Sequence, residues 1–295
     1  MKMKSPTLSE FDLNEIQNLA KSKRQELGFI GRTPIANDID IVLEKLKIKL
    51  LKYPVYSGSE NRLAFSAAII FSKENGDEYT FIGLNTADYY DKQVFAIAHE
   101  LYHFYTKTGI HLSRVDTEHN MIETRANRFA AEFLLPETEI LNIIIDDFKK
   151  SSLVDISDKV LSRFIAKIHC DWWLPYRSIV KRLLEIGSIT NEQYNRLYAI
   201  HERDIESEYY KTGLALNKNV FTMLNSISNE IGTNPPDIEV IIRNFENNLI
   251  DEESFNDLLN MFGKNPDDFG YKINVIESEL DEFSDLFISV NSDED

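Results

Sequence analysis

Three residues in one short run have the types and the spacing of a metal-dependent hydrolase. His99, Glu100 and His103 form HELYH within the run VFAIAHELYHFYTK. Residues four apart in an α-helix lie one turn apart on the same face, so the two imidazoles can bind one Zn²⁺ at about 2.0–2.1 Å. Glu100 lies beside that face, where its carboxylate can act as a general base on a water held by the metal.

The residues around the motif favour a helix that begins shortly before it. Apolar residues recur at helical spacing, and neither Gly nor Pro interrupts them. We expect Asp88 or Asp91 to cap the start of this helix and Gly109 to end it. The alternative is that the two histidines are ordinary members of an amphipathic helix, because HExxH also occurs by chance.

A catalytic zinc site needs a third protein ligand and leaves a fourth position for water. The continuation HExxHxxGxxH is excluded, because the positions that need Gly and His hold Thr106 and Gly109. The remaining candidate is Glu123, twenty residues after His103 in the run TEHNMIETRANRFAAEFLLP. This run predicts a second helix from about residue 117 to 135, which a proline ends.

The second helix carries further polar side chains near the predicted ligand. Asn127 lies four residues after Glu123 and can accept a hydrogen bond from the far nitrogen of a ligating histidine. His119 lies one turn before Glu123, and His111 lies in the loop between the helices. Either histidine, or Tyr102, could stabilise an oxyanion, and the alternative is that they have no role in catalysis.

The motif pair resembles the ImmA/IrrE family of bacterial metallopeptidases. FAIAHELYHF is followed by IETRANRFAAEFLLP, whereas the family pattern is HExxH followed by a segment close to ExxAN-x-FA-x-x-LL-P. This chain has one residue more between the Phe-Ala pair and the Leu-Leu pair, after Glu123. The resemblance covers roughly residues 25–145 well and thins across about 150–205, and nothing beyond that is recognised.

The resemblance implies a gluzincin-like, metal-dependent endopeptidase that cleaves a helix-turn-helix transcriptional repressor. Cleavage would derepress a stress, phage-defence or mobile-element programme. By position, His99, His103 and Glu123 would be the metal ligands and Glu100 the catalytic base. Zn²⁺ is the expected metal, and Mn²⁺ has been considered for some relatives. An alternative of another class is a metal-bound sensor that sequesters a regulator without proteolysis.

Composition indicates a cytoplasmic protein with an uneven charge. A single cysteine excludes an internal disulfide framework, and neither a secretory signal nor an apolar run of membrane-spanning length is recognised. The net charge is −17, and residues 202–295 hold 22 acidic and 6 basic side chains. This acidic third disfavours direct nucleic-acid binding and could attract a basic partner such as a repressor. The alternative is a solvated surface without a partner.

The pattern of elements predicts an α+β fold. Three β-rich runs, IKLLKYPVY, LAFSAAIIFS and YTFIGLNT, precede the HExxH helix, and NGDE predicts a hairpin turn between the second and third. Helices are expected at 10–27 and 37–46, and the chain after Pro136 is mostly helical. The predicted segments are an N-terminal helical extension (1–24), a zincin-like metallopeptidase domain (25–148), a helix-turn-helix-like helical domain (149–212) and an acidic helical region with a disordered tail (213–295).

Overall fold

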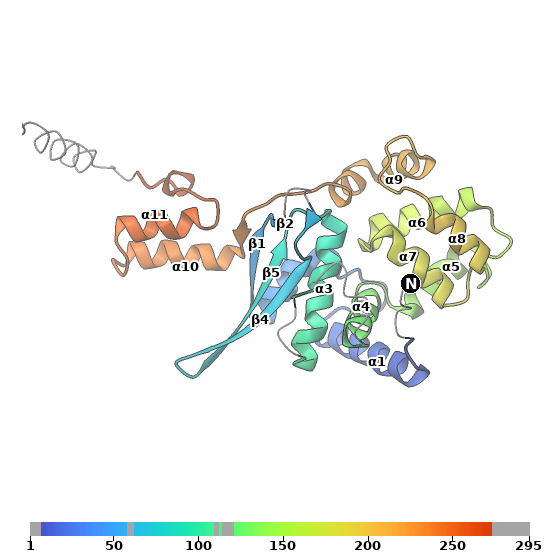
Figure 1. Cartoon of the computed structure of the whole chain (residues 1–295), viewed down its shortest axis with the longest axis horizontal. Helices are drawn as coiled ribbons and strands as arrows, with labels where there is room; N and C mark the ends of the chain where they lie inside the picture. Colours follow the sequence, from blue (N-terminus) through green and yellow to red (C-terminus); the bar gives the residue numbers. More distant parts are fainter. Residues whose placement is uncertain (1–6, 58–61, 109–111, 114–120, 273–295) are drawn as a thin grey trace, which may run out of the picture. The chain divides into compact units, whose positions relative to one another are not determined.

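The computed structural model of the chain describes residues 7–57, 62–108, 112–113 and 121–272. The chain divides into two compact units, Met1–Asn234 and Pro235–Asp295, and each is described by itself. The first unit combines a sheet with helices (Figure 1), which confirms the predicted α+β class.

The first unit is built on one five-stranded sheet. Its strands are β1 (Ile48–Tyr53), β4 (Ala67–Glu74), β5 (Asp77–Asn85), β6 (Leu112–Ser113) and β7 (Gly232–Thr233). They lie in the order β6-β4-β5-β1-β7, with β1 parallel to β5 and the other neighbours antiparallel. A separate two-stranded ladder pairs β2 (Tyr56–Ser57) with β3 (Arg62–Leu63). The three β-rich runs therefore do form strands of a sheet ahead of the HExxH motif.

A tight turn joins β4 to β5, as predicted. Glu74 pairs with Asp77, so Asn75 and Gly76 are the two turn residues. Their φ angles are +52° and +95°, the positive values that a two-residue type I′ turn requires at both positions. Asn and Gly tolerate such angles better than other residues do, which explains why this dipeptide sets the register of the hairpin.

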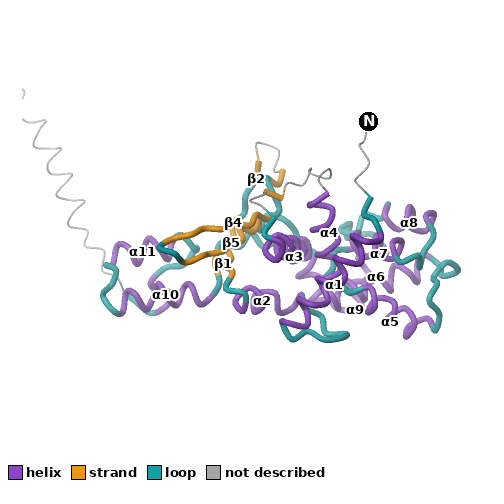
Figure 2. The backbone as a smooth tube through the Cα atoms, turned by 90° about the horizontal axis from the view of Figure 1, so that it is seen from below, coloured by secondary structure: helices purple, strands orange, loops and turns teal. Residues whose placement is uncertain are grey.

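The helix that carries HExxH packs against one face of this sheet. Figures 1 and 2 both place α3 (Tyr90–Thr106) between the strands and the helices α4 (Met121–Leu134) and α1 (Glu10–Glu26). Ala126 and Ala130 are completely buried on α4, and their small side chains allow a close approach to α3. A short helix, α2 (Ile39–Lys45), follows a 3₁₀ turn (Ala36–Asp38) and leads into β1.

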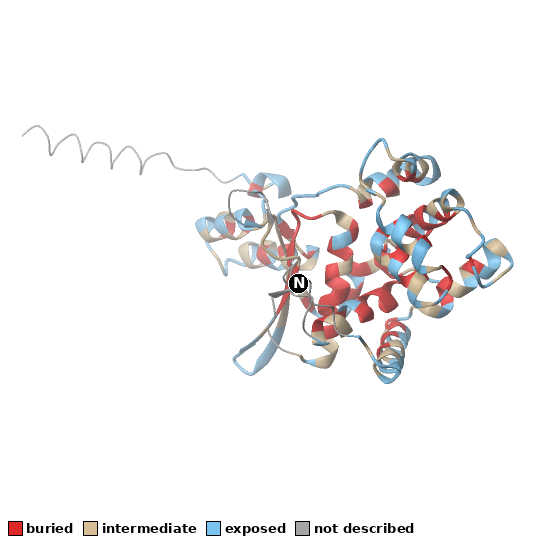
Figure 3. Cartoon of the chain, turned by 45° about the vertical axis from the view of Figure 1, so that its right-hand side comes forward, coloured by how far each residue is buried: buried red, intermediate tan, exposed pale blue. Residues whose placement is uncertain are grey.

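Five helices follow α4 in the first unit. They are α5 (Glu137–Phe148), α6 (Asp158–Trp172), α7 (Tyr176–Glu185), α8 (Asn191–Tyr198) and α9 (Glu208–Leu224). Their apolar faces share one continuous core with the sheet and α3, and Figure 3 shows the buried residues gathered there. The predicted capping box is present at the start of α8, where Thr190 and Gln193 each accept the other's backbone N–H.

A cluster of charged side chains, of which Arg128, Glu132 and Arg182 are buried, joins α4 to α5 and α7. Arg182 Nη2 lies 2.8 Å from Glu132 Oε2, and Arg128 Nη2 lies 3.7 Å from the same oxygen. Arg128 also pairs with Glu137 at 3.2 Å and Glu185 at 3.1 Å. Burial raises the pKa of Glu132 to about 7, and Glu137 and Glu185 add to the rise. Three carboxylates against two guanidinium groups leave an excess negative charge, which one retained proton removes.

Helix α9 bends sharply at Asn217, whose φ and ψ of −154° and 87° are not helical. The bend brings the buried ring of Phe221 over Gly213. A Cβ atom at position 213 would lie 2.1 Å from that ring, so only glycine fits there. Residues 225–234, here called the return segment, then lead back to the sheet and add β7 beside β1.

The second unit contains a helical hairpin with its own small core. It comprises α10 (Pro235–Glu246), α11 (Glu252–Asn260) and a 3₁₀ turn (Pro266–Phe269). Phe245 and Phe255 stack with ring centroids 4.1 Å apart, next to Ile238 and Ile241. Helices were predicted in this stretch, whereas the tail predicted to be disordered lies outside the described residues. No helix in the described parts of either unit is both long and apolar enough to cross a bilayer.

Candidate metal centre

Two turns of α3 and the first turn of α4 bring three predicted ligands together. His99 and His103 approach each other on one face of α3, with 3.3 Å between their Nε2 atoms. Glu123 on α4 places Oε2 3.1 Å from His99 Nε2 and Oε1 3.6 Å from His103 Nε2. All three residues are buried. The spacing anticipated from the sequence is thus present in the fold.

These distances fit a single small cation. A tetrahedral ion with bonds of 2.0–2.1 Å separates its ligand atoms by about 3.3–3.4 Å. The two Nε2 atoms lie 3.3 Å apart, and one potential ligand atom from each of the three residues lies within 4.8 Å of the others. Two imidazole nitrogens and a carboxylate oxygen are a donor set that zinc accepts. Among the residues that the structure describes, His99, His103 and Glu123 form the one group of three or more potential ligands close enough to hold a metal.

The far nitrogens of both histidines are held by acceptors. His99 Nδ1 lies 3.0 Å from Asn127 Oδ1. His103 Nδ1 lies 3.1 Å from the carbonyl oxygen of Thr108 and 3.0 Å from its hydroxyl. A carbonyl oxygen accepts and cannot donate, so Nδ1 of His103 carries the proton and Nε2 keeps its lone pair for a metal. The amide oxygen of Asn127 sets the same tautomer at His99.

The charge of the centre also suits a divalent cation. Without metal, burial works to lower the pKa of His99, but the hydrogen bond that the ring donates to Glu123 and the charges of Glu100 and Glu123 outweigh it and raise the pKa. When a metal is bound, both imidazoles are neutral ligands, and the carboxylate of Glu123 places a negative charge against the divalent ion. The ion would offset the cost of burying that charge.

Glu100 follows His99 directly on α3 and is completely buried. One residue corresponds to a rotation of about 100°, so its carboxylate leaves the helix beside the ligand face and not along it. Its charge also acts to raise the pKa of the adjacent His99 ring. Its predicted role as the base remains a prediction that this placement supports.

Two other predicted residues have different surroundings. The Tyr102 ring lies edge-on to His103 with centroids 5.8 Å apart, but its hydroxyl accepts a hydrogen bond from Arg125 Nε at 3.0 Å. Arg125 also pairs with Asp12 of α1, so the structure directs this hydroxyl towards a structural ion-pair network. His119, like His111, lies outside the described residues, and its role in catalysis stays a prediction.

The ends of α3 differ from those predicted. Neither Asp88 nor Asp91 caps the helix: the N-cap is Tyr89, and no side chain caps it. The Asp91 carboxylate lies inside the first turn and pairs with Arg203, 112 residues later in the sequence. The last residue of the helix is Thr106, and the next residue has a left-handed backbone. The predicted stop at Gly109 lies outside the described residues.

Sequence reasoning did not find Thr108, Arg203 or His169 as neighbours of α3. Thr108 acts partly through its backbone carbonyl, which every residue has, so its type gives no signal. Arg203 and His169 contact the start of α3 from a remote loop and from α6, and only the fold brings them there. An acidic residue at the start of the helix was visible in the sequence, but neither its burial nor its partners were.

The matched family agrees with the geometry of this centre. Residues 43–164 match the peptidase family model described as an IrrE N-terminal-like domain. The match spans the sheet strands β1 to β6, the helices α3 and α4, and all three potential ligands. Neither a curated protein nor a solved structure matches the chain. The matched segment is thus an IrrE N-terminal-like peptidase domain similar to those of the ImmA/IrrE family, and the class of substrate of such a domain is a protein or peptide.

Proposed function

We propose that this protein is a zinc metalloendopeptidase of the gluzincin type. The observation that carries the proposal is the meeting of His99, His103 and Glu123, whose potential ligand atoms all lie within 4.8 Å of one another. The two imidazole Nε2 atoms lie 3.3 Å apart, which is the length of an edge of a zinc tetrahedron. When bound, the ion lowers the pKa of a coordinated water towards about 7 and polarises the scissile carbonyl. Mn²⁺ remains the alternative metal, because its preferred ligands also include carboxylate oxygen.

In this proposal Glu100 acts first as the general base and then as the general acid. Its carboxylate takes a proton from the attacking water, whose oxygen forms a bond to the carbonyl carbon. Glu100 then gives that proton to the amide nitrogen as the carbon–nitrogen bond breaks, which releases a carboxylic acid and an amine, and the acid then loses its proton to the amine or to solvent. Complete burial of Glu100 beside His99 supports this role, because it keeps the acid–base group inside the site.

The unpaired part of β4 is the proposed position of the substrate chain. Within the described residues, β6 pairs with β4 only at Ala67 and Ala68, whereas β4 continues to Glu74. Among the residues that the structure describes, none pairs with the rest of β4 on the side away from β5. Strand β4 also packs against α3. An extended peptide can add to such an edge by main-chain hydrogen bonds and lie beside the metal ligands.

A helix-turn-helix repressor is the proposed substrate, with derepression of a stress, phage-defence or mobile-element programme as the result of cleavage. The family resemblance suggests this class, and the charge of the chain is compatible with it. The described part of the second unit carries nine acidic and three basic residues, a surface that attracts a basic protein at low salt. We place this event in the cytoplasm, where such repressors act.

The proposal is tested by incubating the full chain with the repressor encoded beside it, with and without a chelator, and following the products by gel and mass spectrometry. The expected result is a small set of discrete fragments that disappears with chelator and returns when Zn²⁺ is restored. A stable complex without fragments, whether or not metal is present, would instead support a sensor that sequesters its regulator.

A further inference from the structure

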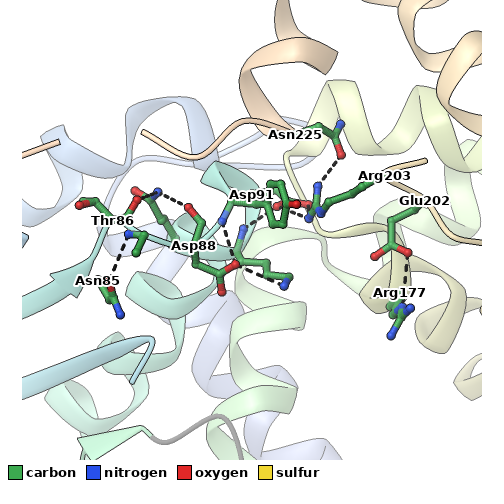
Figure 4. Close-up of polar contacts among 12 residues, drawn as sticks. Asn85, Thr86, Asp88, Asp91, Arg177, Glu202, Arg203 and Asn225 are labelled. Carbon is green, nitrogen blue, oxygen red and sulfur yellow. Dashed lines mark hydrogen bonds and ion pairs between the residues drawn. The ribbon is translucent and has the colours of Figure 1, made fainter. Parts of the chain in front are cut away.

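A buried ion pair holds the first turn of α3 to residues beyond the matched family segment. Arg203 Nη2 lies 2.8 Å and 3.0 Å from the two carboxylate oxygens of Asp91, which is completely buried (Figure 4). The guanidinium group also donates to Asn225 Oδ1 and stacks on the Tyr89 ring, 3.8 Å from its centroid. A planar guanidinium is suited to bind a carboxylate and an aromatic face at once.

A second layer of buried groups supports the same carboxylate. His169 on α6 places Nε2 3.4 Å from Asp91 Oδ2, and its Nδ1 lies 2.9 Å from the hydroxyl of Tyr209 on α9. Both His169 and Tyr209 are buried. Burial acts to raise the pKa of Asp91, but His169 and Arg203 outweigh it and lower the pKa, so the carboxylate stays ionised.

The return segment fixes the same end of the helix from another side. Tyr90 N–H donates to the carbonyl of Ser226 at 2.9 Å, and the Gln93 amide lies 3.2 Å from the Ser228 hydroxyl. The loop before α3 is held as well, because Thr86 donates its hydroxyl to the Glu230 carbonyl at 2.8 Å. The start of α3 therefore depends on contacts with chain that follows residue 164.

We propose that the Asp91–Arg203 pair, with the return segment, is a clamp that positions α3 and thereby the metal ligands His99 and His103. Asp91 precedes His99 by eight residues, about 12 Å along the helix axis, so the clamp cannot touch the metal and acts only by positioning. The third ligand, Glu123, is on another helix. A shift at the start of α3 therefore changes the spacing between ligands on α3 and α4, and metal sites tolerate only about 0.5 Å of misplacement.

The clamp requires a positively charged partner for Asp91. Asp91 is an ionised carboxylate without access to water, so it requires a cation, and the cation supplied is a residue outside the peptidase segment. The matched peptidase domain ends at residue 164. On this inference the domain cannot hold α3 in place without Arg203 and the return segment. The inference about ligand placement rests on the proposed metal site.

The test compares full-length Arg203→Met and Arg203→Lys with the wild type and with Arg196→Met. Arg196 forms an ion pair of the same type with Asp158, at 2.6 Å, but both side chains are exposed and remote from α3, so it is the matched control. Three quantities are measured: amide hydrogen exchange across residues 90–106 in metal-free protein, Zn²⁺ affinity by chelator competition, and kcat and KM on a cleavable peptide.

Arg203→Met is expected to speed exchange in the first two turns of α3, to weaken Zn²⁺ binding at least tenfold, and to lower kcat more than it raises KM. Lysine keeps the charge but loses the planar fork and the stacking, so Arg203→Lys should be intermediate, with affinity about threefold weaker. Arg196→Met should match the wild type in all three measurements. If Arg203→Lys keeps part of the Zn²⁺ affinity that Arg203→Met loses, the loss arises from misplaced ligands and not from a general loss of packing.

Unchanged exchange in α3 together with unchanged Zn²⁺ affinity in Arg203→Met would overturn the clamp. If that variant does not fold, Arg203→Lys decides the matter by the same two measurements. The exchange comparison needs neither metal nor substrate. A wild type that binds no zinc or cleaves nothing therefore refutes the proposed function, while the exchange data still decide whether the clamp holds the helix.

Discussion

Replacing Asn127 by alanine tests whether the proposed ligand His99 is oriented by its neighbour. The Asn127 amide oxygen lies 3.0 Å from His99 Nδ1 and accepts a hydrogen bond from this nitrogen. Without that acceptor, the ring can rotate or change tautomer, and Nε2 then presents its lone pair to the metal for only part of the time. The affinity for metal should fall, because the His99 ring then has to lose its rotational and tautomeric freedom when the metal binds.

The structure sets the expected size of this loss. Removing a partner that orients a ligating histidine costs roughly 10- to 100-fold in metal affinity, or about 1.4–2.7 kcal/mol. Asn127 is an exposed residue, so water can take over part of its role as acceptor. We therefore expect Asn127→Ala to weaken Zn²⁺ binding by about tenfold, the lower end of the range.

Competition with a chromophoric chelator measures this affinity, and Asn127→Asp is the matched control. Aspartate keeps an oxygen acceptor at the same distance, so its Zn²⁺ affinity should stay within about threefold of the wild type. Alanine favours a helix more than asparagine does, so metal-free Asn127→Ala should unfold no more easily than the wild type. Equal affinities for wild type and Asn127→Ala, or equal losses in the two variants, would refute the reasoning.

Two further predictions concern the framework around the site. Glu132 has a pKa of about 7 in the folded protein and about 4.3 when unfolded, so the folded state retains a proton that the unfolded chain releases as pH rises between these values. The free energy of unfolding contributed by this group is therefore largest below about pH 4.3 and is lost as pH rises through 7, with a decrease of about 2–3 kcal/mol between pH 5 and pH 8. Denaturant titrations at pH 5 and pH 8 should show this loss in the wild type and not in Glu132→Gln, and parallel changes in both proteins would contradict it. Separately, Gly213→Ala should destabilise the fold by about 1–3 kcal/mol, because the new Cβ would lie 2.1 Å from the Phe221 ring. Gly83→Ala, whose Cβ would meet nothing closer than 3.9 Å, is its control, and similar unfolding midpoints for the two variants would show that the contact at Gly213 is not tight.

Local signals were enough to predict much of the fold and the side chains of the centre. The Asn75-Gly76 turn depends on the backbone preferences of two adjacent residues. The meeting of His99 with His103 follows from helical periodicity. Glu123 could be predicted because it lies on a second recognisable helix, and its distance from the first pair depends only on how those two helices pack.

The contacts that hold α3 in place could not be predicted in the same way. Asp91 has the residue type and position of a helix cap, and the sequence favoured that role. Its actual partners, Arg203 and His169, lie 112 and 78 residues later, and no periodicity or spacing connects such distant positions. Strand β7 comprises only two residues, too few to produce an alternating pattern.

The division of roles between Glu100 and the three ligands is tested most directly by one variant, Glu100→Gln. Metal content and the rate of repressor cleavage are measured on the same preparation. We predict that the variant retains one equivalent of zinc, because Glu100 is not a ligand, and that cleavage falls by about 10²- to 10⁴-fold, the usual contribution of a general base. Cleavage at the wild-type rate, or loss of the metal together with activity, would contradict this assignment.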